Sequence, residues 1–146
     1  MYRVITIPQP YASFIVMGHK RMNASRHDTK YRGPLLIKAG KNNGGLTRWY
    51  YYQWREAFRL DLPKWEDLPF EAIIGQVNLA DCVPTAEMEP FWGTDIGIIS
   101  GDKEWRLSKQ EMHFGNYADG GYAWLFSDPV KFEVPIQQCH KIKPLP

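Results

Sequence analysis

The chain has 146 residues, of which 44% are hydrophobic and 23% are charged, and its formal net charge is +2. This length predicts a single domain with its own hydrophobic core, and the composition argues against a disordered chain. No run approaches the roughly 20 apolar residues of a membrane-spanning helix, and the amino terminus lacks the apolar block of a signal peptide, so we expect a cytoplasmic protein with no membrane segment.

The first third of the chain predicts a strand, a short helix and a second strand. Residues 2–7, YRVITI, are rich in β-branched side chains, as in a strand, and prolines follow them. PYASFIVMG, residues 10–18, has the apolar spacing of a short helix. Residues 20–26 are expected to be extended and residues 27–33 to form a polar loop, ahead of a buried strand at PLLIKA, residues 34–39.

The middle of the chain predicts a helix at LTRWYYYQWREAFRL, residues 46–60, which is rich in tryptophan and tyrosine. The remainder is expected to hold, in order, a long strand at 71–84 with a twist or bulge at Gly75, a loop-rich stretch at 85–121 with a short helix near 105–112, and strands at 122–129 and 130–142. Five or six strands with one early and one mid-chain helix predict a small, mostly antiparallel β-barrel of the α+β class.

The net charge conceals an asymmetry between the two ends of the chain. Residues 1–60 contain 11 lysines and arginines against 2 acids, a balance of +9, whereas residues 61–146 contain 7 against 14, a balance of −7. If the cations gather on one face, they favour a polyanion such as RNA or DNA, or a phosphorylated small molecule. Equally, the two halves can neutralise each other through surface ion pairs.

A basic loop precedes the strand at 34–39. It contains Arg26, Lys30 and Arg32, with Tyr31 between the last two. Arginine forks match phosphate oxygens, and a tyrosine ring offers a stacking surface to a base. We therefore predict that this loop binds nucleic acid. The alternative is that the cations are only solvated and that Tyr31 caps the core.

Polar side chains ahead of the loop are further candidates for contacts with a nucleotide. Asn23 and Ser25 flank one alanine, so on a strand they share a face and could hydrogen-bond a base edge. Ser13, on the predicted helix, could point into a cleft beside Gln9. The alternatives are ordinary polar residues on a wet strand face and, for Ser13, a contact on the helix surface.

The C-terminal half adds three candidates. Glu111 and His113 are an acid and a base two residues apart, a pair suited to proton transfer, although a capping glutamate and a half-buried histidine are also common. Tyr122 shares a strand face with Trp124, so one of them can line a cleft, and core packing is the alternative. The cysteines and histidines lack metal-ligand spacing, and we expect no metal or cofactor.

Four blocks of sequence follow one another from about residue 7 to residue 126: IPQPYASFIVMGHK, TKYRGPLLIKAGK, EAIIGQVNLADCV and EMHFGNYADGGYAWLF. Together they resemble the ASCH domain family, a branch of the PUA-like superfamily. The resemblance implies a PUA-like β-barrel with a cleft, a single domain over residues 1–146, and an association with RNA or nucleoside chemistry. Some bacterial members hydrolyse 4-acetylcytidine as amidohydrolases, and others are described as ribonucleases.

The resemblance also implies a role for Lys20, because the family commonly places a lysine two residues after a glycine here, as Gly18 and Lys20 do. In amidohydrolase members the lysine acts with a threonine and a carboxylate. Asn23 stands at the position of that threonine, and Ser25 at that of a following arginine. Because an amide does not titrate, Asn23 cannot act as a nucleophile or proton shuttle. Lys20 would be a base or hold an anionic oxygen, or else is a solvated lysine beyond a helix end.

Three functions follow from these residues. The first is an RNA- or nucleotide-binding domain with a cleft around Lys20 and the basic loop. The second is a hydrolase, acting on acetylated cytidine or on RNA, with Lys20 as base or charge stabiliser and Glu111 as a proton carrier. The third is a protein-interaction domain that uses the aromatic helix at 46–60, in a protein that is a monomer or a homodimer.

Overall fold

The computed structural model describes residues 3–43, 46–90, 96–101, 103–107, 120–137 and 143–144. The chain divides into two compact units, and each is described by itself. The first unit comprises residues 1–19, 34–77 and 128–146, and the second comprises residues 20–33 and 78–127. Each unit joins segments that are far apart in the sequence, so neither corresponds to one contiguous stretch.

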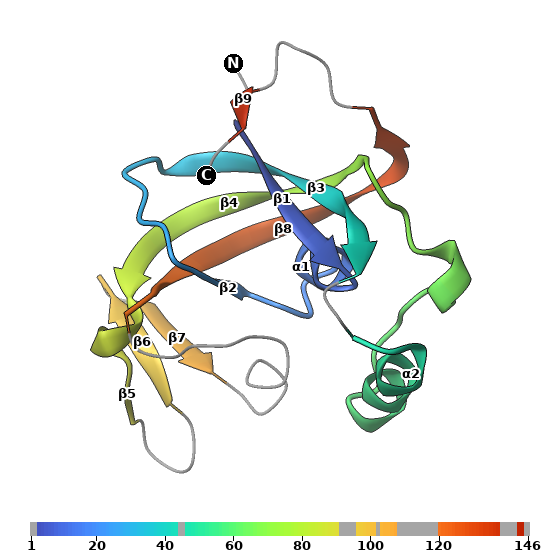
Figure 1. The fold of residues 1–146 in the computed structure, drawn as a ribbon. Coiled ribbons are helices and arrows are strands. Elements are labelled where there is room, and N and C mark those ends of the chain that lie inside the picture. Colours follow the sequence, from blue (N-terminus) through green and yellow to red (C-terminus); the bar gives the residue numbers. More distant parts are fainter. Residues whose placement is uncertain are drawn as a thin grey trace. The chain divides into compact units, whose positions relative to one another are not determined.

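The two long strands, β4 (Ile73–Pro84) and β8 (Tyr122–Ile136), contribute residues to both units (Figure 1). The first unit also contains β1 (Arg3–Gln9), α1 (Tyr11–Val16), β3 (Gly33–Asn43), α2 (Arg48–Ala57), the 3-10 turn η1 (Trp65–Asp67) and β9 (Lys143–Pro144). The second contains β2 (Met22–Ser25), the 3-10 turn η2 (Thr85–Glu87), β5 (Glu89–Pro90), β6 (Ile96–Ser100) and β7 (Lys103–Leu107). In the described ranges, neither α-helix has the length and apolar character needed to cross a membrane.

Most strands belong to a mixed sheet. Hydrogen bonds join them in the order β2–β8–β4–β3–β1–β9, and β5–β6–β7 form a second sheet. β1 is parallel to both neighbours, whereas β2 and β8 are antiparallel. The sequence predicted mostly antiparallel pairing. A parallel β1–β3 pair needs a long connection, which α1 and β2 supply. Among the described residues the strand order has two ends, and no closed barrel is seen.

Helix α1 follows a proline, as the sequence predicted. Pro10 precedes its first turn, and Oε1 of Gln9 accepts a hydrogen bond of 3.0 Å from the main-chain N–H of Ser13. This bond satisfies one of the N–H groups that a helix start leaves without an intrahelical partner. Gly18 follows the helix with φ of 83°, a conformation that favours glycine. Residues 12–16 are all buried, so packing stabilises this short helix.

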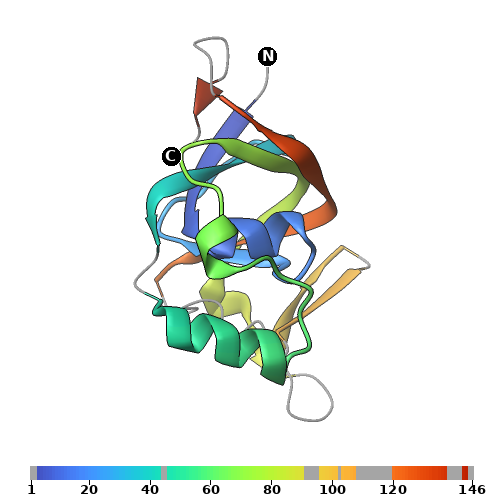
Figure 2. The same cartoon turned by 90° about the vertical axis from the view of Figure 1, so that its right-hand side faces the viewer.

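An aromatic layer links α1, α2 and the connector after α2; both helices are seen in Figure 2. Phe14 and Tyr51 are fully buried and stack with ring centroids 6.3 Å apart. Tyr52 and Trp65 pack edge-on against Tyr51. The Tyr51 hydroxyl donates to the carbonyl of Pro63 at 2.7 Å, and burial raises its pKa to about 12. We call Phe14, Tyr51, Tyr52 and Trp65 the aromatic layer.

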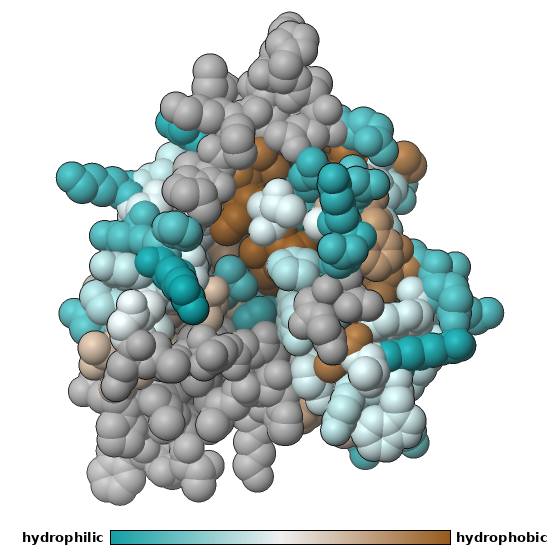
Figure 3. All heavy atoms as spheres, in the orientation of Figure 1, coloured by the Kyte–Doolittle hydropathy of each residue, from teal (hydrophilic) through white to brown (hydrophobic). Residues whose placement is uncertain are grey.

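The outer side of α2 is exposed. Thr47 caps the helix by accepting a hydrogen bond from the main-chain N–H of Tyr50 at 3.3 Å. Trp49 and Tyr50 are 62% and 52% exposed, and Arg48 pairs with Glu66 at 2.6 Å. Figure 3 shows pale aromatic and teal charged side chains over this helix. The aromatic side chains of this helix are therefore divided between packing, as for Tyr51, and exposure, as for Trp49 and Tyr50.

The structure gives a packing reason for Gly75, where the sequence predicted a twist or bulge, and it joins the last two predicted strands into one. A Cβ atom at Gly75 would lie 2.4 Å from the carbonyl oxygen of Val130 and 2.5 Å from Cγ1 of Val16. Close approach of other atoms therefore requires glycine here. Strand β8 is continuous where two strands were predicted, and Asp128 within it has φ of 53°. Aspartate tolerates this left-handed conformation better than most residues, so the strand can continue through this position.

The core of the second unit lies between β2, β8 and the β6–β7 hairpin. Trp105 and Ile98 are 1% exposed and pack with residues of β2 and β8: Met22, Ala123 and Leu125. The sequence predicted a short helix near 105–112, and this is wrong for residues 105–107, which belong to β7. Pairing with β6 and burial of Trp105 outweigh the local preference of these residues for a helix. Residues 108–112 lie outside the described residues.

Candidate nucleic-acid interface

One face of the β2–β8 pair in the second unit carries polar side chains around a buried tryptophan, and we call it the polar face. Their antiparallel register places Asn23 opposite Trp124 and Ser25 opposite Tyr122. Residues directly opposite each other share a face, with Cβ atoms about 4.5–5.5 Å apart. Asn23, Ser25 and Tyr122 are all partly exposed. The structure thus brings three of the predicted binding residues together, and Asn23 and Ser25 share a strand face as predicted.

The opposite face of this strand pair is buried in the core. Met22, Ala123 and Leu125 belong to the core cluster of the second unit. A slip of one residue would exchange the two faces, so burial of one face fixes the orientation of the polar one. The guanidinium of Arg21 lies 5.0 Å from the centre of the Trp105 ring in this cluster. Arg21 therefore covers the core.

Residues 26–33 form what we call the anchored loop, because the second unit fixes their main chain. The indole N–H of Trp124, which is fully buried, donates to the carbonyl of His27 at 2.8 Å. The main-chain N–H of His27 donates to Oγ of Ser25 at 3.1 Å, and that of Tyr31 donates to Oγ1 of Thr29 at 3.2 Å. These bonds position the loop beside the polar face.

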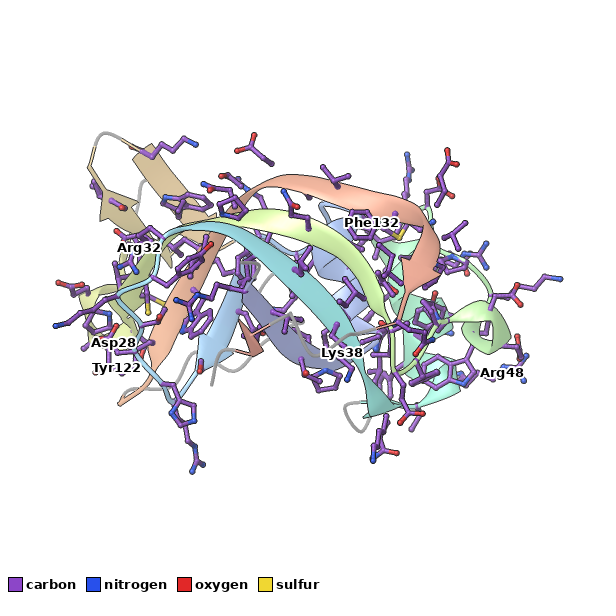
Figure 4. The ribbon with its side chains drawn as sticks, turned by 90° about the horizontal axis from the view of Figure 1, so that it is seen from above. Asp28, Arg32, Lys38, Arg48, Tyr122 and Phe132 are labelled. Atoms are coloured by element: carbon purple, nitrogen blue, oxygen red, sulfur yellow. The ribbon has the colours of Figure 1, made fainter. Side chains whose placement is uncertain are left out.

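Arg32 is the main internal link of the anchored loop. Its Nη1 donates to the carbonyls of Thr29 and Tyr31, both at 2.8 Å, and its Nη2 pairs with Asp81 at 2.9 Å. A planar guanidinium suits this arrangement because its donors point in fixed directions. Arg32, a predicted ligand contact, thus engages the protein itself, although its side chain is 39% exposed. Arg26 and Lys30 are exposed on the same loop. Figure 4 shows Asp28 and Arg32 on the segment after β2 and Tyr122 at the start of β8.

Asp81, which lies on β4 and not in the loop, fixes the anchored loop by pairing with Arg32. Besides Arg32, it accepts hydrogen bonds from the hydroxyl of Ser100 and from the main-chain N–H of Cys82, the latter at 2.8 Å. Partial burial opposes ionisation of Asp81, but these hydrogen bonds outweigh it and hold its pKa below the ordinary value. Asp81 is therefore an anion at neutral pH, as its pairing with Arg32 requires.

Cys82 is adjacent to this cluster but is not activated. Burial raises the pKa of its thiol to about 11, and a hydrogen bond from its Sγ to Oδ1 of Asp28, at 3.4 Å, adds to the increase. A thiol with this pKa is neutral at physiological pH and is a poor nucleophile. Cys82 therefore contributes to packing beneath the anchored loop.

Lys20 is 2% exposed, and its Nζ donates to the carbonyl of Met22 at 2.6 Å. The alternative of a solvated lysine beyond the helix end is therefore wrong. Lysine is among the residues that are least often fully buried, because an ammonium group loses its hydration there. The burial of Lys20 thus requires a structural or functional explanation.

The charges of the second unit nearly cancel. Residues 20–33 contribute +4 and residues 78–127 contribute −5, so the unit has a net charge of −1. The Arg32–Asp81 pair is one direct contact between these segments. The surplus of cations in the first 60 residues therefore does not give this unit a surplus of positive charge, and any attraction for an anion must come from the local placement of Arg26 and Lys30.

Gln9 and Ser13 belong to the first unit. Gln9 is fully buried, and its amide donates to the carbonyl of Pro69 at 2.8 Å while its oxygen binds the main-chain N–H of Ser13. Ser13 lines a cavity of about 190 Å³. The other residues of this wall come from α1, the connector after α2, β4 and β8: Val16, Met17, Pro63, Asp67, Pro69, Ile74, Lys131, Phe132, Glu133 and Pro135. Gln9 and Ser13 are thus hydrogen-bonded to each other, and Ser13 lines a cavity of the first unit.

Glu111 and His113 lie outside the described residues. Asp81 and Ser100, which help to fix the anchored loop, were not among the predicted site residues. The hydrogen bond from Trp124 to the loop main chain was not predicted either. The excess of acids in residues 78–127 was the available signal that a carboxylate would meet the basic loop.

Comparisons with known proteins give a structural likeness alone. No family model matches the chain, and no curated protein matches it. Two crystal structures of mutants of the ZmASCH protein from Zymomonas mobilis are similar to it. A tyrosine-to-phenylalanine mutant is 19% identical with a TM-score of 0.48, over 94% of this chain and 76% of that one. A serine-to-alanine mutant is 20% identical with a TM-score of 0.46, over 92% and 72%.

Proposed function

We propose that the chain is an RNA- or nucleotide-binding domain of the PUA-like ASCH type, and that its ligand lies on the polar face of β2 and β8 beside the anchored loop. The observation that carries this proposal is the shared face of Asn23, Ser25 and Tyr122. An amide and a hydroxyl can hydrogen-bond a base edge, and the phenol ring of Tyr122 can stack on a base.

The anchored loop adds the charges that such a ligand needs. Arg26 and Lys30 are exposed, and the loop main chain is held by Trp124 and Arg32. Because the loop is already ordered, the entropy lost on binding is smaller than for a mobile loop. Each phosphate contact to single-stranded nucleic acid makes the logarithm of the association constant fall by about 0.7 per unit of log salt concentration.

Fluorescence anisotropy of a labelled single-stranded RNA tests this proposal. We expect the double substitution Arg26→Ala with Lys30→Ala to weaken binding at low salt and to reduce the salt slope by about 1.4, for two lost contacts. The matched control replaces two exposed cations of the first unit, Lys41→Ala with Lys64→Ala, and should leave the affinity nearly unchanged. Equal losses in both double variants, or no binding by the wild type, would refute the proposal.

Hydrolysis of a modified nucleoside is a second candidate, favoured by the burial of Lys20. A lysine removed from water is more easily deprotonated and can act as a base, or it can hold an anionic oxygen. Incubation of 4-acetylcytidine with the wild type and with Lys20→Met separates these ideas, because methionine keeps most of the side-chain volume. Release of acetate by the wild type alone, with both proteins folded by circular dichroism, supports catalysis, and equal background rates exclude it.

A further inference from the structure

One edge of the first unit has no strand partner in the described part of the chain. On one side, β8 is joined to β4, and on the other side β2 pairs only with residues 122–125 of β8. Residues 130–136 therefore present an open edge among the described residues, and Phe132, which belongs to it, is labelled in Figure 4. Main-chain groups on such an edge are available to a strand from another molecule.

The same edge carries exposed apolar side chains. Val130, Val134 and Ile136 are 50%, 75% and 51% exposed, and they account for three of the seven large hydrophobic residues that are exposed in the described residues. Phe132 lies between them and is partly buried against the core cluster of Val4, Leu36 and Ile73. An apolar stripe on an open strand edge indicates that another surface covers it.

The charges on this edge complement those of a second copy of the same edge. Lys131 and Glu133 are both exposed and stand on either side of Phe132. In an antiparallel two-fold pairing centred on Phe132, Lys131 of each copy lies opposite Glu133 of the other, and Val130 lies opposite Val134. Opposite charges across an antiparallel pair are stabilising, and like charges there are destabilising.

We propose that the protein self-associates through β8, by antiparallel pairing of residues 130–134 with the same residues of a second copy. Pro129 and Pro135 lie opposite each other in this register. Since proline has no N–H group, they limit the inter-chain ladder to the five residues between them. Lysine and proline on an edge often prevent pairing, but here the lysine of one copy meets a glutamate of the other. A ladder this short gives a weak, concentration-dependent dimer.

Analytical ultracentrifugation of the intact chain tests the pairing, over about 10 μM to 1 mM, the range in which a small interface dissociates. The wild type should approach twice its mass of 17.0 kDa as concentration rises. Lys131→Glu gives one copy two acids and Glu133→Lys gives one copy two bases, and each alone should raise the dissociation constant about tenfold or more. An equimolar mixture of the two variants should dimerise again, because every opposed pair then has opposite signs.

Two controls separate this register from general effects of charge and from misfolding. Lys64→Glu changes an exposed charge of the first unit and should leave the dimer intact. Val134→Lys should disrupt it, and circular dichroism should show native secondary structure for every variant. A single-chain mass at all concentrations would overturn the proposal. It would also be overturned if both charge reversals left the dissociation constant unchanged, or if the equimolar mixture of the two variants did not dimerise.

Discussion

The aromatic layer of the first unit and the anchored loop of the second are both fixed by tertiary contacts, but of different kinds. The aromatic layer depends on fully buried rings, Phe14 and Tyr51, with one polar link to Pro63. The anchored loop depends on hydrogen bonds and on the partly exposed Arg32–Asp81 pair. Burial of a large side chain contributes more than a single hydrogen bond. The helices of the first unit should therefore control global stability, and the loop contacts should control local order at the candidate interface.

The largest effect should come from the aromatic layer. Phe14→Ala removes a buried ring that stacks on Tyr51, and we expect it to lower the free energy of unfolding by about 4 kcal/mol. Urea denaturation monitored by circular dichroism measures the change. Phe14→Leu, the matched control, keeps much of the apolar volume and should cost less than half as much. A loss below about 1 kcal/mol for alanine would mean that the layer does not dominate stability.

A smaller loss of stability is expected at Trp124, whose ring is buried and whose indole N–H binds the anchored loop. Trp124→Phe removes the donor to the His27 carbonyl and leaves a small cavity, for an expected loss of about 2 kcal/mol. Hydrogen exchange should accelerate for the amides of residues 27–31 and stay unchanged in α1. Exchange that rises equally in both places would show that the loop has no local stability of its own.

Within the anchored loop, the geometry of Arg32 should matter more than its charge. Arg32→Lys keeps the cation but cannot donate to Thr29, Tyr31 and Asp81 in the same directions, so we expect a loss of about 1 kcal/mol. Thermal unfolding measures it, with Lys30→Arg as the matched exposed control. If Arg32→Lys is as stable as the wild type, charge alone holds the loop.

The smallest effect should be a pH dependence. The pKa of Asp81 is lowered in the folded chain, so its ionised form stabilises the fold above its ordinary pKa of 3.8, and this contribution is lost as pH falls through the folded pKa. The stability difference between wild type and Asp81→Asn should therefore be constant from pH 7 to pH 5 and shrink below about pH 4. Parallel pH profiles from pH 7 to pH 3 would contradict this role.

Local sequence patterns predicted the elements that depend mainly on neighbouring residues. The first strand, the helix after Pro10, the buried strand PLLIKA and the aromatic helix all lie where periodicity and proline placement indicated. The β6–β7 hairpin escaped prediction because Trp105 is fixed by a core whose other members lie elsewhere in the sequence. Propensity carries no information about such contacts.

In the candidate site too, features set by neighbouring residues could be predicted, and contacts between distant residues could not. Alternation along residues 23–25 was enough to place Asn23 and Ser25 on one face. The internal role of Arg32 could not be predicted, since Asp81 is 49 residues away in the chain. The overall charge imbalance favoured a basic surface, but it could not show which cations meet carboxylates.

Mapping the ligand-binding surface by amide chemical shifts during titration with a short single-stranded RNA tests the central claim most directly. The polar face and the anchored loop should respond, with shifts at residues 23–32 and 122–124 that vanish in the Arg26→Ala, Lys30→Ala variant. Shifts confined to α2, or none with RNA at about 1 mM, a concentration at which even a weak complex forms, would contradict it.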